Sequence, residues 1–307
     1  MKPFFVFSGQ GAQSVGMGRD LAESSKAAAD VFKQADEVLG YALSDIIFNG
    51  PEDKLTQTRY CQVAIYTMSC AALAAFQEKF PEVKPLACAG LSLGEYGALF
   101  AAGAFDFATG LKLLAKRAEL MDVACNATCG GMASILNGDI AIIREVCEEC
   151  NIDVANYNSP GQIVISGEKE LVSQAVAKLK ERGIRKAIEL NVAGAFHSRL
   201  MASAGASLEP VLAETAITMP AVPVYHNFSA AVSASADEIR TNLAKQVAGS
   251  VRWDECVKAI VASGADTMIE FGPGNVLTKL CSRAIPEVKV CNINSAATLE
   301  AAAEALA

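Results

Sequence analysis

The chain alternates short apolar runs with longer stretches in which apolar residues recur every three to four positions. The short runs predict buried strands, and the longer pattern predicts helices that bury one face. The first apolar run, Phe4–Phe7, is followed by a glycine-containing loop over 8–18 and a helical pattern over 19–39. A strand, a glycine-containing loop and a helix in this order predict an α/β fold.

The same alternation continues along most of the chain. We expect further strands at residues 86–90, 222–227 and 267–271. We expect further helices at residues 62–80, 94–104, 111–122, 200–214, 238–247, 253–263, 274–281 and from about 295 onward. The segment 94–104 is apolar on nearly every side, which indicates a buried helix.

The middle of the chain follows a different order. Strand patterns occur at residues 131–136, 152–157, 162–166 and 184–190, and helical patterns at 139–150 and 169–182. The order β-α-β-β-α-β is that of a ferredoxin-like unit. We therefore predict a larger α/β domain made of residues 1–127 and 192–307, with a small ferredoxin-like domain, residues 128–191, inserted into it.

Composition and charge narrow the class of protein. The chain has 307 residues, 52% of them hydrophobic, which is enough for a sizeable core. Asp and Glu number 34 against 26 Lys and Arg, and the formal net charge of −8 argues against nucleic acid as a partner. No run approaches the roughly 20 apolar residues of a membrane span, and the start lacks the features of a signal peptide. We expect a cytoplasmic monomer that binds no membrane.

The ten cysteines have irregular spacing, which favours free thiols in a reducing compartment over a disulfide framework. Cys125 and Cys129, together with Cys147 and Cys150, resemble the paired spacing of a zinc site, and structural zinc stays open as an alternative. The loop over 8–18 lacks the third glycine or the lysine of phosphate-binding loops. We therefore expect no metal and no bound cofactor.

A serine between two glycines is the first candidate for chemistry. Gly90-Leu91-Ser92-Leu93-Gly94 fits the pattern G-x-S-x-G and lies between a predicted strand and a predicted helix. This context is that of a nucleophile elbow, in which a sharp turn exposes the serine hydroxyl beside a helix N-terminus. The alternative is an ordinary serine that caps the helix.

A serine nucleophile needs a base, and the chain contains two histidines. His197 lies in the loop segment Gly194-Ala195-Phe196-His197-Ser198, between a predicted strand and a predicted helix. His226 ends an apolar strand and is expected to be a structural residue. We therefore favour His197 as the base and keep His226 as the alternative.

Arg117 interrupts the apolar face of the helix predicted at 111–122, whose other charged residues lie on the opposite side. A buried guanidinium costs several kcal/mol unless an anion meets it. Two partners fit this position. One is an internal Asp or Glu, and the other is a substrate carboxylate bound by two parallel hydrogen bonds.

These motifs, taken together, resemble the malonyl-CoA:acyl-carrier-protein transacylase family over essentially the whole chain. The matching segments are Gly9-Gln10-Gly11-Ala12-Gln13, the serine elbow, Arg117, Asn156-Tyr157-Asn158-Ser159-Pro160-Gly161-Gln162, Gly194-Ala195-Phe196-His197-Ser198, Gln246 ahead of Val251-Arg252-Trp253, and Phe271-Gly272-Pro273-Gly274. The resemblance implies a hydrolase-like α/β core with a mainly parallel sheet and a ferredoxin-like insert, which agrees with the pattern above.

The resemblance also implies an activity and its main residues. A malonyl group would pass from malonyl-CoA to the phosphopantetheine thiol of acyl carrier protein, in support of fatty-acid synthesis. Ser92 would carry the acyl group between two half-reactions, with His197 as its base. Arg117 would hold the free carboxylate of the malonyl group. No metal or bound cofactor would take part.

Further roles are implied at matching positions. The backbone N–H groups of Gln10 and Leu93 would form the oxyanion hole, and the carbonyl of Gln246 would orient His197 in place of an acidic residue. Phe196, before the histidine, resembles the malonyl-selective pattern. Asn156 would line the pocket.

Two positions depart from the family pattern. Leu91 stands where the family usually has histidine, which places a polar role at the pocket rim in doubt. Gly249-Ser250 replaces a commoner Asn-Pro, so the loop after Gln246 could be more mobile. Two other functions fit part of the evidence: a serine hydrolase of esterase or thioesterase type, and a non-catalytic module that binds acyl-CoA or carrier protein.

A cluster of basic residues suggests where an acidic carrier protein could dock. Lys178, Lys180, Arg182, Arg185 and Lys186 gather at the end of the helix predicted at 169–182. Charge complementarity would favour docking at such a patch. The alternative is a solvated helix face with no partner.

Overall fold

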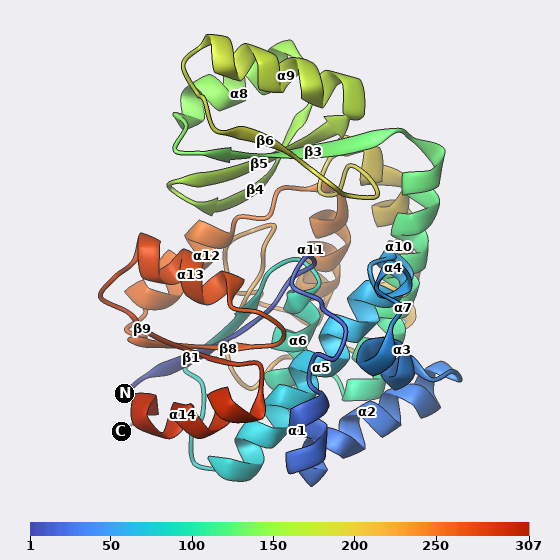
Figure 1. Cartoon of the computed structure of the whole chain (residues 1–307), viewed down its shortest axis with the longest axis vertical. Helices are drawn as coiled ribbons and strands as arrows, with labels where there is room; N and C mark the ends of the chain where they lie inside the picture. Colours follow the sequence, from blue (N-terminus) through green and yellow to red (C-terminus); the bar gives the residue numbers. More distant parts are fainter. Residues whose placement is uncertain (307) are drawn as a thin grey trace.

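The computed structural model describes residues 1–306 and contains two β-sheets with helices around them (Figure 1). The larger sheet is entirely parallel, with the strand order β7-β2-β1-β8-β9. Its strands are β1 (Pro3–Phe7), β2 (Ala87–Gly90), β7 (Val224–Tyr225), β8 (Thr267–Phe271) and β9 (Lys289–Ile293). The predicted α/β class with a mainly parallel sheet is confirmed.

The central position of β1 in the larger sheet explains why its residues form an unbroken apolar run. All five of its residues are buried. Phe5 and Phe7 pack into the larger core cluster with Phe271, whereas Phe4 and Val6 pack into a second cluster on the other face. Because alternate residues of a strand point to opposite faces, both faces of this sheet must be covered by helices.

Helices cover the two faces in two groups. The first group, which packs with the larger cluster, is α1 (Arg19–Ser24), α2 (Lys26–Leu39), α3 (Leu43–Asn49), α4 (Glu52–Leu55), α5 (Thr58–Lys79), α6 (Gly94–Ala101), α7 (Phe107–Ala127), α10 (Ala202–Glu214), α11 (Ala236–Ala248) and α14 (Ala296–Leu306). A short 3₁₀ helix, η1 (Arg199–Met201), precedes α10. The second group is α12 (Trp253–Ala262) and α13 (Val276–Ala284).

The smaller sheet is entirely antiparallel, with the order β4-β5-β3-β6. Its elements are β3 (Gly130–Leu136), α8 (Ile140–Glu149), β4 (Asp153–Ser159), β5 (Gln162–Glu168), α9 (Lys169–Glu181) and β6 (Ala187–Leu190). The helices α8 and α9 lie together on the outer face of this sheet (Figure 1). The β-α-β-β-α-β order expected from the sequence is present, and the domain boundaries themselves stay a prediction.

Three local differences from the sequence-based expectation have physical causes. Ser25 divides the helix expected at 19–39, because its backbone is extended and its hydroxyl caps α2 by accepting the Ala28 N–H. The strand expected at 222–227 shrinks to two residues because the chain turns at His226, whose N–H donates to the Ala231 carbonyl. The edge strand β9 was not expected, since its sequence KVCNI is half exposed and mixes polar with apolar positions.

The structure also bears on the cysteines and on membranes. All ten cysteines are free thiols. Cys125 lies near the end of α7, whereas Cys147 and Cys150 pack in the core of the smaller sheet. Among residues 1–306, His, Cys, Asp and Glu form no group of three or more that could hold a metal ion. In the same residues, no helix combines the length and the apolar character that crossing a membrane requires.

Candidate active site

Ser92 occupies a sharp turn between β2 and α6, and its φ of +54° is a left-handed conformation. The flanking glycines make this turn fit. A Cβ at Gly90 would lie 2.0 Å from backbone atoms of Gly94, and a Cβ at Gly94 would lie 2.2 Å from the Phe7 carbonyl oxygen. Only glycine allows the turn to pack this closely on β1. The elbow geometry predicted from the pattern G-x-S-x-G is therefore present.

Asn227 holds this elbow from the neighbouring strand end. Its side-chain oxygen accepts the Ser92 N–H at 2.6 Å, and its side-chain nitrogen donates to the Gly90 carbonyl at 2.8 Å. Both hydrogen bonds act on backbone groups that a strained turn leaves without a partner in regular secondary structure. Asn227 therefore stabilises the conformation of the nucleophile elbow.

His197 lies directly against the serine. Its Nε2 accepts the Ser92 hydroxyl at 2.8 Å, and its Nδ1 donates to the main-chain carbonyl of Gln246 at 2.8 Å. A carbonyl oxygen can only accept, so the hydrogen must sit on Nδ1. The free electron pair of the neutral ring then points at the Ser92 hydroxyl, which is the arrangement that a general base needs.

The surroundings keep His197 neutral. Burial, followed by the nearby charge of Arg117, lowers the pKa of His197 to about 4. Hydrogen bonds with backbone groups of Gln246 and Gly249, and the charge of Glu95, act in the opposite direction. At neutral pH the ring is therefore an unprotonated base.

Arg117 projects from α7 and is 1% exposed. Its terminal nitrogens donate to Gln62 Oε1 at 2.5 Å, to Ser92 Oγ at 3.0 Å and to Gln246 Oε1 at 3.1 Å. Among residues 1–306 no carboxylate forms an ion pair with it, and its Nε has no acceptor. Burial lowers the pKa of Arg117. The guanidinium is thus a buried cation beside the serine whose direct partners are neutral, and the internal salt bridge considered from the sequence is absent from the described residues.

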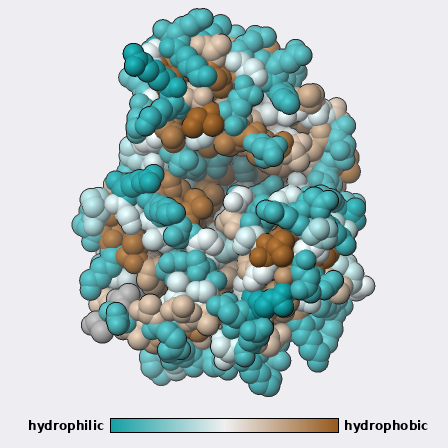
Figure 2. All heavy atoms as spheres, in the orientation of Figure 1, coloured by the Kyte–Doolittle hydropathy of each residue, from teal (hydrophilic) through white to brown (hydrophobic). Residues whose placement is uncertain are grey.

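A cavity of about 660 Å³ opens onto these groups. It is lined by strands of the smaller sheet and by loops and helices around the larger one. Figure 2 shows a hollow, bordered by apolar side chains, between the two parts of the molecule. The sequence-predicted residues that line it are Gln10, Leu91, Ser92, Arg117, Asn156, Phe196 and His197. The distant segments expected to form one site therefore meet at one cavity.

Leu93 and Gln246, the predicted positions that do not line the cavity, lie next to residues that do. The backbone N–H groups of Gln10 and Leu93 find no protein acceptor among residues 1–306, so both are available to a ligand. Leu91 packs over Gly9 at the cavity rim, which gives this position an apolar role. The loop after Gln246 is tied down, since the Ser250 hydroxyl donates to the Val154 carbonyl at 2.6 Å.

Three polar residues of the site were not anticipated. Gln62, Glu95 and Asn227 are each fully buried and bond to Arg117, to His226 or to the elbow. The available signal was a polar residue inside an otherwise apolar segment, as at Gln62 and Glu95. His226 faces away from the serine and bonds to Glu95 Oε1 at 2.6 Å, which is the structural position expected for it.

Comparisons with known proteins agree with this geometry. The sequence profile of the acyl transferase domain family matches residues 4–301. The malonyl CoA-acyl carrier protein transacylase of Bacillus subtilis is 41% identical, with 98% of this chain and 96% of the relative covered. The protein of the same name from Haemophilus influenzae is 37% identical over the full length of both chains.

A solved structure extends the similarity to the fold. It holds a malonyl-transacylase in complex with the holo acyl-carrier protein of a type II polyketide synthase, and the transacylase is 37% identical with a TM-score of 0.96 over 99% of both chains. Sequence, fold and the residues around the cavity thus agree over essentially the whole length. The chain belongs to the acyl transferase family, among the malonyl CoA-acyl carrier protein transacylases.

Proposed function

We propose that the chain transfers the malonyl group of malonyl-CoA to the phosphopantetheine thiol of acyl carrier protein, through a malonyl ester of Ser92. The observation that carries this proposal is the meeting of a serine, its base and a buried cation without an acidic partner in one cavity. The names of the relatives support the substrate and the acceptor.

The first half-reaction forms the ester. His197 Nε2 takes the proton of the Ser92 hydroxyl while Oγ attacks the thioester carbonyl carbon. The negative charge that develops on the carbonyl oxygen is stabilised by the N–H groups of Gln10 and Leu93. The carbon–sulfur bond then breaks, and the departing CoA sulfur takes the proton from His197.

The second half-reaction runs the same path with the roles of sulfur and oxygen exchanged. The phosphopantetheine thiol gives its proton to His197 and attacks the ester carbonyl carbon. The carbon–oxygen bond breaks, and Ser92 recovers its proton from the imidazolium. Gln246 accepts from Nδ1 throughout, so the ring keeps its orientation in both directions.

Arg117 selects the acyl group. Its terminal nitrogens lie within hydrogen-bond distance of Ser92 Oγ, so a carboxylate held there would place the adjoining carbonyl near the nucleophile. A malonyl group supplies the anion that the buried guanidinium lacks, whereas an acetyl group supplies only a methyl. The apolar side chain of Phe196 on the cavity wall limits water beside the ester.

Compartment, pathway and oligomeric state are part of the proposal. Ten free thiols support a reducing compartment, which we take to be the cytoplasm, with fatty-acid synthesis as the pathway supplied. A monomer suffices for the reaction proposed, since one chain contributes every residue named above. Measurement of the solution mass by light scattering tests the monomer.

One experiment separates the transferase from a hydrolase and from a binding module. The protein is mixed with malonyl-CoA and its intact mass is measured, and holo acyl carrier protein is then added. A transferase gains the mass of one malonyl group and passes it to the carrier. Release of free malonate without carrier loading would identify a hydrolase, and an unchanged mass would identify a binding module. The Ser92→Ala variant must show no adduct.

A further inference from the structure

Glu95 lies in the first turn of α6, behind the nucleophile, and is fully buried. Its carboxylate accepts three hydrogen bonds. His226 Nδ1 donates to Oε1 at 2.6 Å, while the Asn227 N–H at 2.9 Å and Gln246 Nε2 at 2.7 Å donate to Oε2. A group that only accepts, surrounded by three donors, is an ionised carboxylate.

The partner histidine does not cancel this charge. His226 Nδ1 carries the hydrogen that reaches Glu95, and Nε2 is buried with no partner among the described residues. A second hydrogen on Nε2 would be a buried unsatisfied donor, which is costly. His226 is therefore neutral, and the pair of Glu95 and His226 carries one negative charge.

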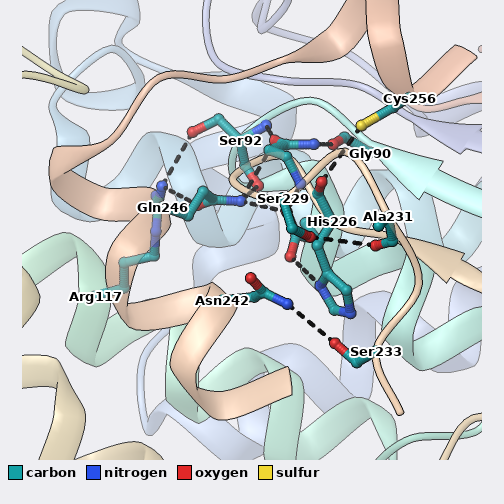
Figure 3. Close-up of polar contacts among 12 residues, drawn as sticks. Gly90, Ser92, Arg117, His226, Ser229, Ala231, Ser233, Asn242, Gln246 and Cys256 are labelled. Carbon is teal, nitrogen blue, oxygen red and sulfur yellow. Dashed lines mark hydrogen bonds and ion pairs between the residues drawn. The ribbon is translucent and has the colours of Figure 1, made fainter. Parts of the chain in front are cut away.

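The side chain of Gln246 connects Glu95 to Arg117, the buried cation that has no ion pair among the described residues. The Gln246 side chain donates from Nε2 to Glu95, and its Oε1 accepts from Arg117 at 3.1 Å. The Gln246 main-chain carbonyl accepts from His197 Nδ1. Figure 3 shows Gln246 between Arg117 and Ser92, with His226 on the side away from Arg117.

We propose that Glu95 is a positioning residue of the transferase, whose buried negative charge orients Gln246 toward both Arg117 and His197 and balances the Arg117 cation at a distance. This inference rests on the function proposed above. An ion pair in direct contact would occupy the guanidinium and exclude a substrate carboxylate. Balance through an amide leaves the terminal nitrogens of Arg117 bonded only to neutral acceptors, which an incoming carboxylate can replace.

The negative charge of Glu95 also acts on His197, the base of the reaction. Arg117 opposes a positive charge on His197, and Glu95 favours it. The other titratable groups that pack around Glu95 are Tyr96 on its own helix, His226, and Cys256, whose thiol donates to the His226 carbonyl at 3.4 Å. In each half-reaction His197 becomes an imidazolium for a moment. Removal of the Glu95 charge should therefore slow proton transfer while malonyl-CoA still binds.

The test uses the full chain with Glu95→Gln, which keeps the shape and one acceptor oxygen, removes the charge and replaces the other oxygen with an NH₂ donor. We expect kcat to fall about tenfold or more and KM for malonyl-CoA to stay equal or decrease. The acid limb of kcat/KM should move to lower pH, and the ¹⁵N NMR titration of His197, one of only two histidines, should move in the same direction. Glu270→Gln is the control, because Glu270 is equally buried and bonds elsewhere, to Ser8, Leu277 and Thr278.

An unchanged titration of His197, or a loss of activity no greater than in Glu270→Gln, would overturn the inference. If Glu95→Gln does not fold, Gln246→Leu replaces it, since this variant cuts the bridge but keeps the main-chain carbonyl. A kcat like that of the wild type in Gln246→Leu would equally overturn the inference. Failure of the proposed function is recognised separately: the wild-type protein would then form no malonyl adduct, and both proposals would fall.

Discussion

Arg117 is a cation 1% exposed to solvent whose direct hydrogen-bond partners are Gln62, Ser92 and Gln246. Full loss of an ionic partner from a buried pair costs about 3–5 kcal/mol. The neutral acceptors reduce that penalty, so we expect malonyl-CoA to be preferred over acetyl-CoA by about a hundredfold, or roughly 3 kcal/mol. Arg117→Ala should lower kcat/KM for malonyl-CoA by about that factor while acetyl-CoA activity is kept or rises.

The comparison requires kcat/KM for both thioesters in both proteins. Lys116→Ala is the matched control, because Lys116 is the preceding residue on α7 and pairs with Glu119 at the surface. It should leave both activities unchanged. An equal fall of malonyl and acetyl activities in Arg117→Ala would make Arg117 a structural residue.

Ser92 combines a chemical role with an unfavourable backbone conformation. Ser92→Ala and Ser92→Gly both remove the nucleophile and should lower turnover by about a millionfold. The two variants should differ in stability, because a φ of +54° costs an L-residue about 1–2 kcal/mol that glycine avoids. After allowance for the greater freedom of glycine in the unfolded chain, we expect Ser92→Gly to be more stable than Ser92→Ala by about 1 kcal/mol. Denaturant unfolding of both variants measures this difference, and an equal or reversed order would show that the turn is not strained.

At the scale of residues, the sequence indicated the groups that react but not those that hold them. Ser92 and His197 could be identified because few residue types do this chemistry and each lay in a recognisable loop. Asn227 and the side chain of Gln246 could not be identified, because their roles depend on which backbone groups the fold leaves without partners. Those groups appear only when residues more than 100 positions apart in sequence meet.

At the scale of elements, the basic cluster at the end of α9 has less unpaired positive charge than its sequence suggested. Lys178 pairs with Glu149, and Arg182 pairs with Glu145 and Glu149, all three of the acid contacts coming from α8. These pairs connect the two helices at the surface and cancel part of the positive charge. Lys180, Arg185 and Lys186 have no ion pair among the described residues.

The unpaired part of this cluster supplies a test of carrier docking. Arg185→Glu with Lys186→Glu should raise KM for acyl carrier protein severalfold and leave KM for malonyl-CoA unchanged, because reversed charge repels an acidic partner. Lys26→Glu with Lys33→Glu on α2 is the control of equal charge change, and it should leave both constants as in the wild type. If the two double variants have the same KM for the carrier, docking takes place elsewhere.

Regular elements were predictable where periodicity was strong, as in β8 and α9. The helices α3 and α4 and the strand β9 were not, because each is short and half polar. A short segment of this kind takes its conformation from what it packs against. The break at Ser25 is similar. One serine does not interrupt the helical pattern of the sequence, and its capping role shows only in the structure, where its backbone is extended and its hydroxyl accepts the Ala28 N–H.

At the scale of the whole molecule, the buried His197 makes stability depend on pH. Its pKa of about 4 in the folded protein lies below the ordinary 6.5, so the unfolded chain binds a proton first as pH falls. The free energy of unfolding that the neutral His197 contributes is fully present above pH 6.5 and is lost as pH falls toward 4. Between pH 7 and 4 the wild type should therefore lose up to about 3 kcal/mol more unfolding free energy than a variant without this histidine.

His197→Asn is the suitable variant, because His197 has a φ of +56° and asparagine tolerates that conformation. Urea unfolding of both proteins at several pH values gives the difference between their free energies of unfolding. The contributions of the other titrating groups are the same in both proteins and cancel in this difference. If wild type and His197→Asn lost stability in parallel as pH fell, burial would not be holding the ring neutral.

The order of the strands has a consequence for the protein during its synthesis on the ribosome. β1 lies between β2 and β8, so this strand gains its second neighbour only when residues 267–271 have been synthesised. Ser92 and Arg117 are synthesised early, whereas Gln246, whose carbonyl orients His197, is synthesised much later. Contacts this distant along the chain form late and slowly. A nascent chain therefore exposes one edge of an apolar sheet and carries an inactive serine until residues 246 and 267–271 have been synthesised, and during this interval it is open to aggregation.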